Sequence, residues 1–360
     1  MSREEFRDKF QKKYQKETGV EIHSADKTPD TTFIPTGILS FDASSGIGGF
    51  PRGRMVEVFG PESGGKSLLA LVSIAYAQKI LKASTALYFD LEGGTPREWL
   101  ETLNIKTDDV DIVPAGLNAE QVLDAIIEAV KSGGYDYIVV DSVAGMVPKA
   151  ELEGEINKAY IAELARALSK GLKKIVSALS THDVETAPCV IMINQIREKP
   201  GTMFGNPETT PGGRALKFYS AQRYRVTKKS QSQQTAGGDV IGHVVKITNK
   251  KNKLGPPLRE GEFFINYTQG VDTVATILSA VKSRKMYVKK GQKYHLTIED
   301  GTEPIVFNKV SDIEDKIRDD QEFQMRIYKA VISKYFKADD KPVTTNEGDE
   351  FSFNPEDDKD

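Results

Sequence analysis

The segment GPESGGKS, residues 60–67, has the residue types and spacing of a phosphate-binding loop. It matches G-x-x-x-x-G-K-[ST] and lies between an apolar run and an amphipathic stretch, the strand-to-helix setting in which this pattern binds nucleotide. Backbone N–H groups in such a loop attract anionic phosphate. We expect Lys66 to reach the β- and γ-phosphates and the Ser67 hydroxyl to ligate Mg²⁺. The expected nucleotide-binding residues are Gly60, Pro61, Glu62, Ser63, Gly64, Gly65, Lys66 and Ser67.

Two acidic residues follow apolar runs and could serve the same nucleotide. Asp141 ends the run YIVVD, and Glu92 lies in YFDLEGG. Phosphoryl transfer needs a carboxylate in the metal shell, and hydrolysis needs a group that orients the attacking water. Because the C-terminal ends of parallel strands meet at one crevice, we expect Asp141 near Mg²⁺ and Glu92 near the water. The alternatives are that Asp141 caps a turn and that Glu92 is a solvated loop acid.

A parallel sheet is needed to position these residues. Four apolar runs have the length of strands: 55–59, 85–90, 137–141 and 189–195. Three amphipathic stretches lie between or beside them: 67–82, 119–131 and 160–180. Continuous apolar strands that alternate with helices indicate an α/β fold, with a mostly parallel sheet covered on both faces. After residue 215 the pattern becomes rich in strands, which we expect to extend one end of the same sheet.

Composition excludes several classes of protein. The 360 residues are 39% hydrophobic and 28% charged, with a net charge of −3, so a packed core and a solvated surface are expected. The single cysteine, Cys189, lies in an apolar run and excludes a disulfide framework or a cysteine zinc site. Since no run of about 18 apolar residues is present, we expect no membrane span and a cytoplasmic location.

Four longer segments resemble the bacterial RecA recombinases. They are GPESGGKS, YDYIVVDSVAGMVPKAELEGEI, INQIR and MFGNPETTPGGRALKFY, and the similarity runs from about residue 33 to residue 272. The last segment is long and unusual, so it is far more specific than the phosphate-binding loop. The resemblance implies a RecA-like P-loop NTPase core with a mostly parallel central sheet, a short N-terminal helix and a small α+β C-terminal domain.

The resemblance also implies roles for residues around the nucleotide. Glu92 corresponds to the glutamate that activates water, and Asp141 to the metal-associated aspartate. Gln195 corresponds to the glutamine that senses the γ-phosphate and couples it to DNA. Trp99 falls where the family has a tyrosine that stacks on adenine, and core packing is the alternative.

Three further residues are implied at the contact between subunits. Lys251 and Lys253 match the two lysines that reach into the ATP of the neighbouring subunit, and Phe218 matches an interface aromatic. The residues implied to act in hydrolysis are therefore Glu92, Lys66, Gln195, Lys251 and Lys253.

The sequence departs from the family pattern at several positions. Ser67 replaces a threonine and keeps its hydroxyl, Pro96 replaces an aspartate that helps to contact adenine, and Arg214 replaces an asparagine. Such drift would suit a phage-encoded member of the family.

Two DNA-binding loops are implied, at 153–162 and 198–213. The second is rich in glycine and proline, so its backbone can follow DNA closely. Met203 and Phe204 at its centre could wedge between bases, and the alternative is that they pack back onto the core. The candidate DNA contacts are Glu153, Gly154, Ile161, Arg166, Lys173, Arg197, Lys199, Met203, Phe204, Gly205, Asn206, Gly212, Gly213 and Arg214.

The segment before the core, residues 1–32, predicts a helix and a linker. Phe6, Phe10 and Tyr14 recur every four residues, which places them on one helix face. This apolar stripe packs either on its own domain or on a neighbouring subunit, and an oligomerisation role is expected.

Beyond the ATPase and DNA-binding core at 33–272, two segments differ in character. Residues 273–338 have helix and hairpin patterns and predict a small domain; its basic segment 282–293 could capture duplex DNA or be a solvated hairpin face. Residues 339–360 form an acidic tail that is expected to be disordered and could compete with DNA for that basic segment.

Together these features predict an ATP-dependent homologous-recombination and DNA-repair protein of the DNA-damage response. It would form helical filaments on single-stranded DNA, hydrolyse ATP in a DNA-dependent way, and exchange strands with homologous double-stranded DNA. Single-strand-binding and loading proteins are further candidate partners. The alternatives are a ring-forming motor or helicase with the same core, and a scaffold or mediator that binds ATP without hydrolysing it.

Overall fold

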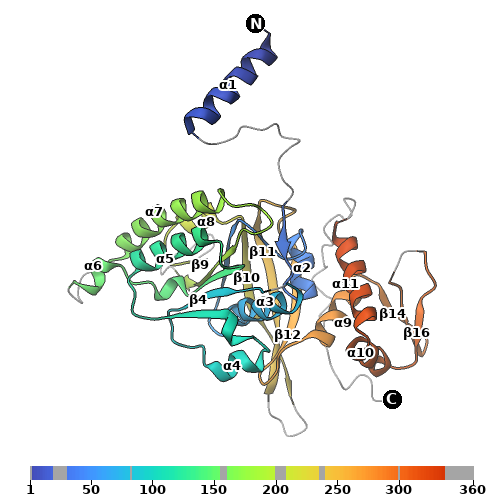
Figure 1. The fold of residues 1–360 in the computed structure, drawn as a ribbon. Coiled ribbons are helices and arrows are strands. Elements are labelled where there is room, and N and C mark those ends of the chain that lie inside the picture. Colours follow the sequence, from blue (N-terminus) through green and yellow to red (C-terminus); the bar gives the residue numbers. More distant parts are fainter. Residues whose placement is uncertain are drawn as a thin grey trace. The chain divides into compact units, whose positions relative to one another are not determined.

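The computed structural model describes residues 2–18, 31–81, 83–154, 160–198, 208–234, 240–298 and 301–336. The chain divides into two compact units, Met1–Thr31 and Thr32–Asp360. Their helices and strands are labelled in Figure 1.

The first unit contains the helix α1 (Arg3–Thr18). Ser2 and Glu5 cap its start reciprocally, because the Ser2 N–H donates to Glu5 Oε2 at 2.7 Å and the Glu5 N–H donates to Ser2 Oγ at 3.1 Å. The rings of Phe10 and Tyr14 stack with their centroids 6.0 Å apart. The helix predicted from the apolar stripe is confirmed, and the surface on which the stripe packs stays a prediction.

The second unit is built on a nine-stranded sheet of order β13-β12-β11-β10-β3-β7-β6-β4-β5. The neighbouring strands from β10 to β5 are parallel, and β11, β12 and β13 continue the sheet antiparallel from β10. The strands are β3 (Met55–Gly60), β4 (Ala86–Asp90), β5 (Val110–Pro114), β6 (Tyr137–Asp141), β7 (Cys189–Gln195), β10 (Gln222–Gln234), β11 (Val240–Asn252), β12 (Glu260–Asn266) and β13 (Gly270–Asp272). The mostly parallel sheet and its extension at one end are confirmed.

The register of the parallel strands aligns their C-terminal ends. Gly60 of β3 is the partner of Gln195 of β7, and Asp90 of β4 is the partner of Asp141 of β6. Polar side chains from three of these strands therefore meet at one edge of the sheet, where a ligand crevice is expected in an open α/β sheet.

Helices cover both faces of the sheet (Figure 1). The helix α3 (Lys66–Ile80) packs on one face, and the other face carries α5 (Ala119–Ser132), α7 (Ile161–Leu179) and α8 (Ala215–Tyr219). In the part of the chain that the structure describes, no helix is both long and apolar enough to cross a membrane.

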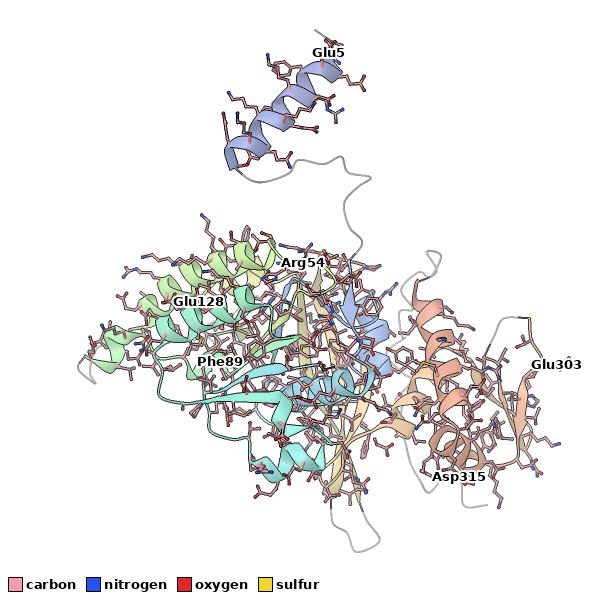
Figure 2. The ribbon with its side chains drawn as sticks, viewed as in Figure 1. Glu5, Arg54, Phe89, Glu128, Glu303 and Asp315 are labelled. Carbon is pink, nitrogen blue, oxygen red and sulfur yellow. The ribbon has the colours of Figure 1, made fainter. Side chains whose placement is uncertain are left out.

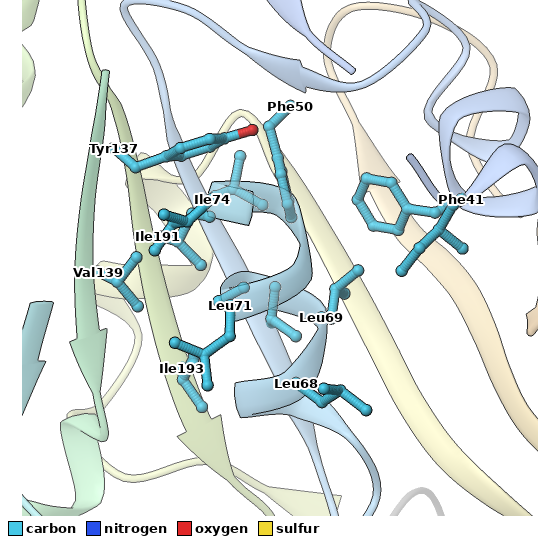
Figure 3. Packing of buried hydrophobic residues seen from close by; sticks show 14 of the residues in the cluster. Phe41, Phe50, Leu68, Leu69, Leu71, Ile74, Tyr137, Val139, Ile191 and Ile193 are labelled. Atoms are coloured by element: carbon cyan, nitrogen blue, oxygen red, sulfur yellow. The ribbon is translucent and has the colours of Figure 1, made fainter. Parts of the chain in front are cut away.

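Two hydrophobic clusters lie on either side of the central strands. Along β7, Ile191 and Ile193 face the α3 cluster, whereas Val190 and Met192 belong to the cluster beneath α5 and α7. Figure 3 shows Ile191 beside Ile74 of α3, and Ile193 near Leu71 of the same helix. Burial on both faces explains why these strands are continuous apolar runs rather than alternating ones.

Apolar side chains are mostly buried and charged side chains are mostly exposed in the strands and in the helices that cover them. Phe89 of β4 is fully buried between the sheet and its covering helices, whereas Glu128 of α5 is an exposed partner of Lys131 (Figure 2).

Shorter elements complete the core. They are β1 (Phe33–Ile34), α2 (Leu39–Ser45), β2 (Phe50–Pro51), α4 (Arg97–Thr102), η2 (Thr107–Asp109), η3 (Val143–Gly145), α6 (Lys149–Leu152), β8 (Arg197–Glu198) and β9 (Glu208–Thr209). The hairpin β8–β9 is the described foot of the segment expected to be the second DNA loop.

The C-terminal part has its own hydrophobic cluster, which also includes Leu39 and Ala43 of α2. Its elements are α9 (Thr273–Ser283), β14 (Tyr287–Lys290), β15 (Lys293–Leu296), β16 (Ile305–Phe307), α10 (Val310–Asp319) and α11 (Gln321–Phe336). The predicted helices and hairpin are present, and the hairpin β14–β15 gains a third strand, β16.

A buried carboxylate joins the C-terminal part to α2. Asp42 is fully buried and accepts hydrogen bonds from the Thr36 N–H at 3.0 Å, the Thr36 hydroxyl at 2.8 Å and the Tyr328 hydroxyl at 2.5 Å. Burial raises the pKa of Asp42 to about 7 in spite of these hydrogen bonds.

Candidate active site

The loop that joins β3 to α3 needs glycine at both of its ends. A Cβ on Gly60 would lie 1.9 Å from the Val226 carbonyl oxygen of the neighbouring strand β10. Gly65 has a φ of +91°, and a Cβ there would lie 2.7 Å from Ile265 Cδ1. The loop can therefore pack closely against β10 and β12 only because these side chains are missing.

Lys66 lies inside the loop that it was expected to serve. Its ammonium is mostly buried and donates to the Pro61 carbonyl oxygen at 2.6 Å. Burial lowers the pKa of Lys66, whereas the nearby carboxylates of Asp141, Glu92 and Glu62 act in the opposite direction. These three carboxylates would repel a bound phosphate, and the Lys66 cation can offset that repulsion.

The two expected magnesium ligands contact each other. Asp141, at the end of β6, forms a hydrogen bond with the Ser67 side chain and accepts another from the Tyr88 hydroxyl at 2.6 Å. Burial raises the pKa of Asp141, and both hydrogen bonds oppose that shift. The sequence reasoning did not find Tyr88; its signal was a tyrosine inside an apolar strand, whose hydroxyl needs a buried partner.

These side chains fit a magnesium ion. Mg²⁺ prefers oxygen ligands and is usually held in nucleotide sites by one or two protein groups together with phosphate and water. The Ser67 hydroxyl and the Asp141 carboxylate are such groups. Within the described residues there is no cluster of three or more acidic, histidine or cysteine ligands, so a protein-only metal cage is not seen there.

Glu92 is connected to the end of β7. Gln195 Nε2 donates to Glu92 Oε1 at 2.9 Å, and the Ser142 hydroxyl donates to the same oxygen. Gln195 Oε1 is buried and has no hydrogen-bond partner among the described residues. The sequence reasoning missed Ser142, although it directly follows Asp141, to which it is joined by a cis peptide bond.

Trp99 lies on α4 and is half-buried against the α3-side cluster. Pro96 directly precedes this helix. The structure therefore contains the packing expected as the alternative role of Trp99, and stacking on adenine stays a prediction.

The three expected interface residues gather at the C-terminal end of α8. Lys251 Nζ donates to the carbonyl oxygens of Lys217, Phe218 and Ser220 at 2.6, 3.0 and 2.8 Å. Lys253 Nζ lies 5.8 Å from the centre of the Phe218 ring, and this ring is 69% exposed. Burial, with Lys253 and Arg223 nearby, lowers the pKa of Lys251 to about 8.

The described DNA candidates lie on or beside four elements, α6, α7, β8 and α8. Glu153 and Gly154 follow α6, and Ile161 opens α7, where Arg166 and Lys173 are exposed. Arg166 pairs with Glu163 at 3.0 Å. Arg197, Gly212, Gly213 and Arg214 lie at the base of the second loop. Five further candidates lie outside the described residues: Lys199, Met203, Phe204, Gly205 and Asn206.

The base of the second loop approaches the phosphate-binding loop. Arg197 of β8 pairs with Glu62 at 3.6 Å. On the return, Gly212 and Gly213 have φ values of +85° and +75° and lead into α8, with Arg214 exposed at its start. The expected DNA segment and the expected nucleotide segment are thus adjacent in the chain fold.

The basic segment 282–293 lies at the end of α9 and on the β14–β15 hairpin. The rings of Tyr287 and Tyr294 stack with their centroids 5.5 Å apart. Lys282 and Lys289 lie over these rings, at 5.2 and 5.4 Å. The segment therefore combines cations with aromatic side chains on one small sheet.

The chain resembles known proteins over most of its length. A family model described as "RecA N-terminal domain" matches residues 4–272. Protein RecA from Lactobacillus acidophilus is 43% identical over 263 residues, which are 72% of this chain and 69% of that protein. Protein RecA from Citrifermentans bemidjiense is 41% identical over 282 residues, which are 78% of this chain and 81% of that protein.

Two further similarities extend this comparison. Protein RecA from Aquifex pyrophilus is 42% identical over 268 residues, 74% of each chain. A solved structure described as the RadB recombinase covers 66% of this chain and 98% of its own, with 21% identity and a TM-score of 0.49.

Proposed function

The chain belongs to the RecA family and is an ATP-dependent DNA recombination and repair protein with DNA-dependent ATPase activity; on this basis, we propose how its own residues perform that activity. Glu92 is proposed to orient the attacking water and to accept its proton. Lys66 and the loop N–H groups hold the phosphates, and Ser67 and Asp141 hold Mg²⁺, which would stabilise charge on them. Trp99 is proposed to contact the base.

One observation carries the coupling of hydrolysis to DNA. Gln195 donates to Glu92 at 2.9 Å, and only Ile196 separates it from β8, the foot of the proposed second DNA loop. A change in that loop can therefore move the side chain that holds the proposed catalytic carboxylate. Conversely, a change at the γ-phosphate can reach the loop through the same hydrogen bond.

Assembly is proposed to place ATP between subunits in a helical filament on single-stranded DNA. Phe218, Lys251 and Lys253 form one surface beside α8, which we assign to the contact with the nucleotide site of the next subunit. A head-to-tail contact of this kind uses two different surfaces and so gives a filament when it does not close. The filament would pair its strand with a homologous duplex and exchange strands.

The flanking segments are proposed to assist this reaction. The unit with α1 would serve oligomerisation, and the basic segment 282–293 would capture double-stranded DNA, with the acidic tail as its competitor. Single-strand-binding and loading proteins are proposed partners. A cytoplasmic location and a role in the response to DNA damage fit this assignment.

The test is ATP hydrolysis with and without single-stranded DNA. Wild-type chain should be strongly stimulated by DNA, and Glu92→Gln should bind DNA while losing at least about 100-fold in turnover. Glu98→Gln, which changes an exposed glutamate of α4, is the matched control and should keep wild-type activity. Hydrolysis that ignores DNA would contradict the proposed coupling.

The competing functions predict other results. A ring-forming motor or helicase would unwind duplex DNA processively. A scaffold would bind ATP and DNA with negligible turnover in both the wild type and Glu92→Gln.

A further inference from the structure

Ser142 follows the C-terminal end of β6 and is 1% exposed. Two contacts hold the segment around it beside the segment that carries Glu92. The Leu91 N–H donates to the Asp141 carbonyl oxygen at 2.8 Å, and a Cβ on Gly145 would lie only 3.2 Å from Leu91 Cβ. The chain that leaves β4 and the chain that leaves β6 are therefore packed together just beyond the sheet, and this packing places the Ser142 and Glu92 side chains next to each other.

Two donors are directed at the same oxygen of Glu92. The Ser142 hydroxyl and Gln195 Nε2 both donate to Oε1, the second at 2.9 Å. Each carboxylate oxygen has about two positions that accept hydrogen bonds, so these two donors fill Oε1. In the part of the chain that the structure describes, neither an N–H nor a hydroxyl donates to Oε2 of this exposed glutamate. Oε2 is thus the oxygen left to accept a proton from water.

The two donors differ in their freedom to move. The Ser142 hydroxyl is one bond beyond Cβ, and its residue is fixed further because the Ser142 carbonyl oxygen accepts the Gly145 N–H at 2.9 Å. Gln195 is half-buried at the end of β7, and its Oε1 has no hydrogen-bond partner among the described residues. A glutamine side chain is long and gives up much rotamer freedom when it is ordered. Ser142 is therefore the fixed donor of the pair, and Gln195 is the donor that can leave.

We propose that Ser142 is a positioning residue for ATP hydrolysis: its hydroxyl holds Oε1 of Glu92 so that Oε2 faces the attacking water. The inference deepens the proposed function and rests on it, because it requires Glu92 as the group that accepts the proton. Ser142 keeps this orientation when Gln195 moves from Glu92 toward the γ-phosphate.

The bonds that change do not include Ser142. The water oxygen forms a bond to the γ-phosphorus, and the water proton passes to Oε2 of Glu92. The bond from the γ-phosphorus to the leaving oxygen breaks, and its electron pair stays on ADP. Ser142 contributes only by holding the accepting carboxylate in the geometry that this transfer needs.

The first measurement is steady-state ATP hydrolysis by the full chain at saturating single-stranded DNA. Ser142→Ala removes the donor and should lower kcat about tenfold, the effect of one hydrogen bond to a charged group. KM for ATP and the dissociation constant for oligothymidylate should stay within about twofold of the wild type, because the lost contact is made with Glu92 and not with either ligand. Ser142→Thr keeps a hydroxyl and should retain kcat within about threefold of the wild type.

Ser73→Ala is the matched control. Ser73 is fully buried, and its hydroxyl donates to the Leu69 carbonyl oxygen within α3 at 2.6 Å, so its removal should leave kcat unchanged. Circular dichroism checks the folding of every variant. If Ser142→Ala does not fold, Ser142→Cys takes its place with the same expected loss of kcat, because a thiol is close to a hydroxyl in size but is a weak donor.

Two comparisons separate positioning from a structural role. Added to Glu92→Gln, Ser142→Ala should cause no further loss of the single-turnover rate, because the carboxylate that Ser142 positions is already gone. A structural hydroxyl would instead lower the rate by the same factor with Glu92 and with Gln at that position. In addition, Ser142→Ala should lower the rates with and without DNA by one factor, whereas Gln195→Ala should change the ratio of the two rates.

The outcomes distinguish this inference from the proposed function. A wild-type kcat in folded Ser142→Ala, or an equal loss with and without Glu92→Gln, overturns the inference, and the proposed function stands if Glu92→Gln is inactive. If Glu92→Gln hydrolyses ATP at the wild-type rate, the proposed role of Glu92 fails and the inference fails with it. If DNA does not stimulate the wild type, the proposed coupling fails, and the rates of Ser142→Ala without DNA still decide the inference.

Discussion

Asp141 and Asp42 present the same chemistry in two different regions of the second unit. Both are at most 8% exposed, and both accept a hydrogen bond from a tyrosine hydroxyl, at 2.6 Å from Tyr88 and 2.5 Å from Tyr328. In both cases burial is the largest effect on the carboxyl group and raises its pKa. Judged by burial and pKa alone, either residue could be the functional one.

The two aspartates differ in whether their surroundings leave the carboxylate accessible to a ligand. Asp141 lies at the C-terminal edge of the sheet, beside Ser67 and near the Lys66 cation. Asp42 is enclosed in α2, and its hydrogen bonds come from the neutral groups of Thr36 and Tyr328. A perturbed pKa therefore marks a functional carboxylate only when the group also lies at a ligand crevice with chemically matched neighbours.

Replacing each aspartate by asparagine should give the largest functional difference between the two sites. Asp141→Asn removes the negative oxygen proposed for the magnesium shell, so ATP turnover should fall by about 100-fold or more. Asp42→Asn keeps the shape of a residue far from that crevice and should leave turnover within about twofold of the wild type. Steady-state hydrolysis at saturating ATP, Mg²⁺ and DNA measures both, with circular dichroism to confirm folding.

If Asp42→Asn lost turnover as severely as Asp141→Asn while still folded, the distinction between a functional and a structural carboxylate would be wrong. Equal and nearly normal turnover in both variants would remove Asp141 from the proposed mechanism.

Stability as a function of pH is the next largest effect, and Asp42 should dominate it. Its pKa in the folded chain, about 7, is above the ordinary value of 3.8, so the folded state favours the protonated form. The stabilisation is complete below about pH 4, decreases as the pH rises, and is lost above about pH 7. Between pH 5 and pH 8 this group should cost the wild type about 2–3 kcal/mol of unfolding free energy.

Denaturant unfolding of the wild type and of Asp42→Asn at several pH values measures this effect. The difference between the two free energies should move in favour of the variant as the pH rises from 5 to 8. A difference that stays constant over this range would mean that Asp42 is not the titrating group.

The sequence predicted the edge of the sheet well because the signals there are local. The loop from Gly60 to Ser67 is one continuous pattern, and Asp141 and Gln195 each end an apolar run. Parallel strands then bring their ends together whatever the details of packing. The strand β5 was missed because it is an edge strand, in which Asp111 is exposed and Ile112 is 40% exposed, so it has no continuous apolar pattern.

The partners that tune the site could not be predicted because they depend on contacts between distant segments. The Tyr88 hydroxyl meets Asp141 across 53 residues, and Arg223 meets Glu57 across 166. The link from Asp42 to Tyr328 spans 286 residues. Nothing in the neighbouring sequence of any of these residues specifies its partner, because the register of the sheet and the packing of α11 on α2 decide it.

The smallest predicted effect concerns the two tyrosines that donate to Asp141 and Asp42. It compares the two carboxylates most directly. Tyr88→Phe and Tyr328→Phe each remove one buried hydroxyl that donates to a carboxylate, so each should cost about 1–2 kcal/mol of unfolding free energy. Only Tyr88 acts on the proposed magnesium ligand. Because its hydrogen bond lowers the pKa of Asp141, Tyr88→Phe should leave that carboxylate harder to ionise.

The Mg²⁺ concentration for half-maximal hydrolysis should therefore rise in Tyr88→Phe by a factor of about 2 to 10. Tyr328→Phe, at similar stability, should require the wild-type concentration of Mg²⁺. This pairing separates an effect on ionisation from a general loss of stability, since the second would shift both variants alike. A Mg²⁺ requirement that rose equally in the two variants would show that the Tyr88 hydroxyl contributes to stability and not specifically to Mg²⁺ binding by Asp141. The hydrogen bond to Ser67 would then be the only contact of Asp141 described here that supports its proposed role.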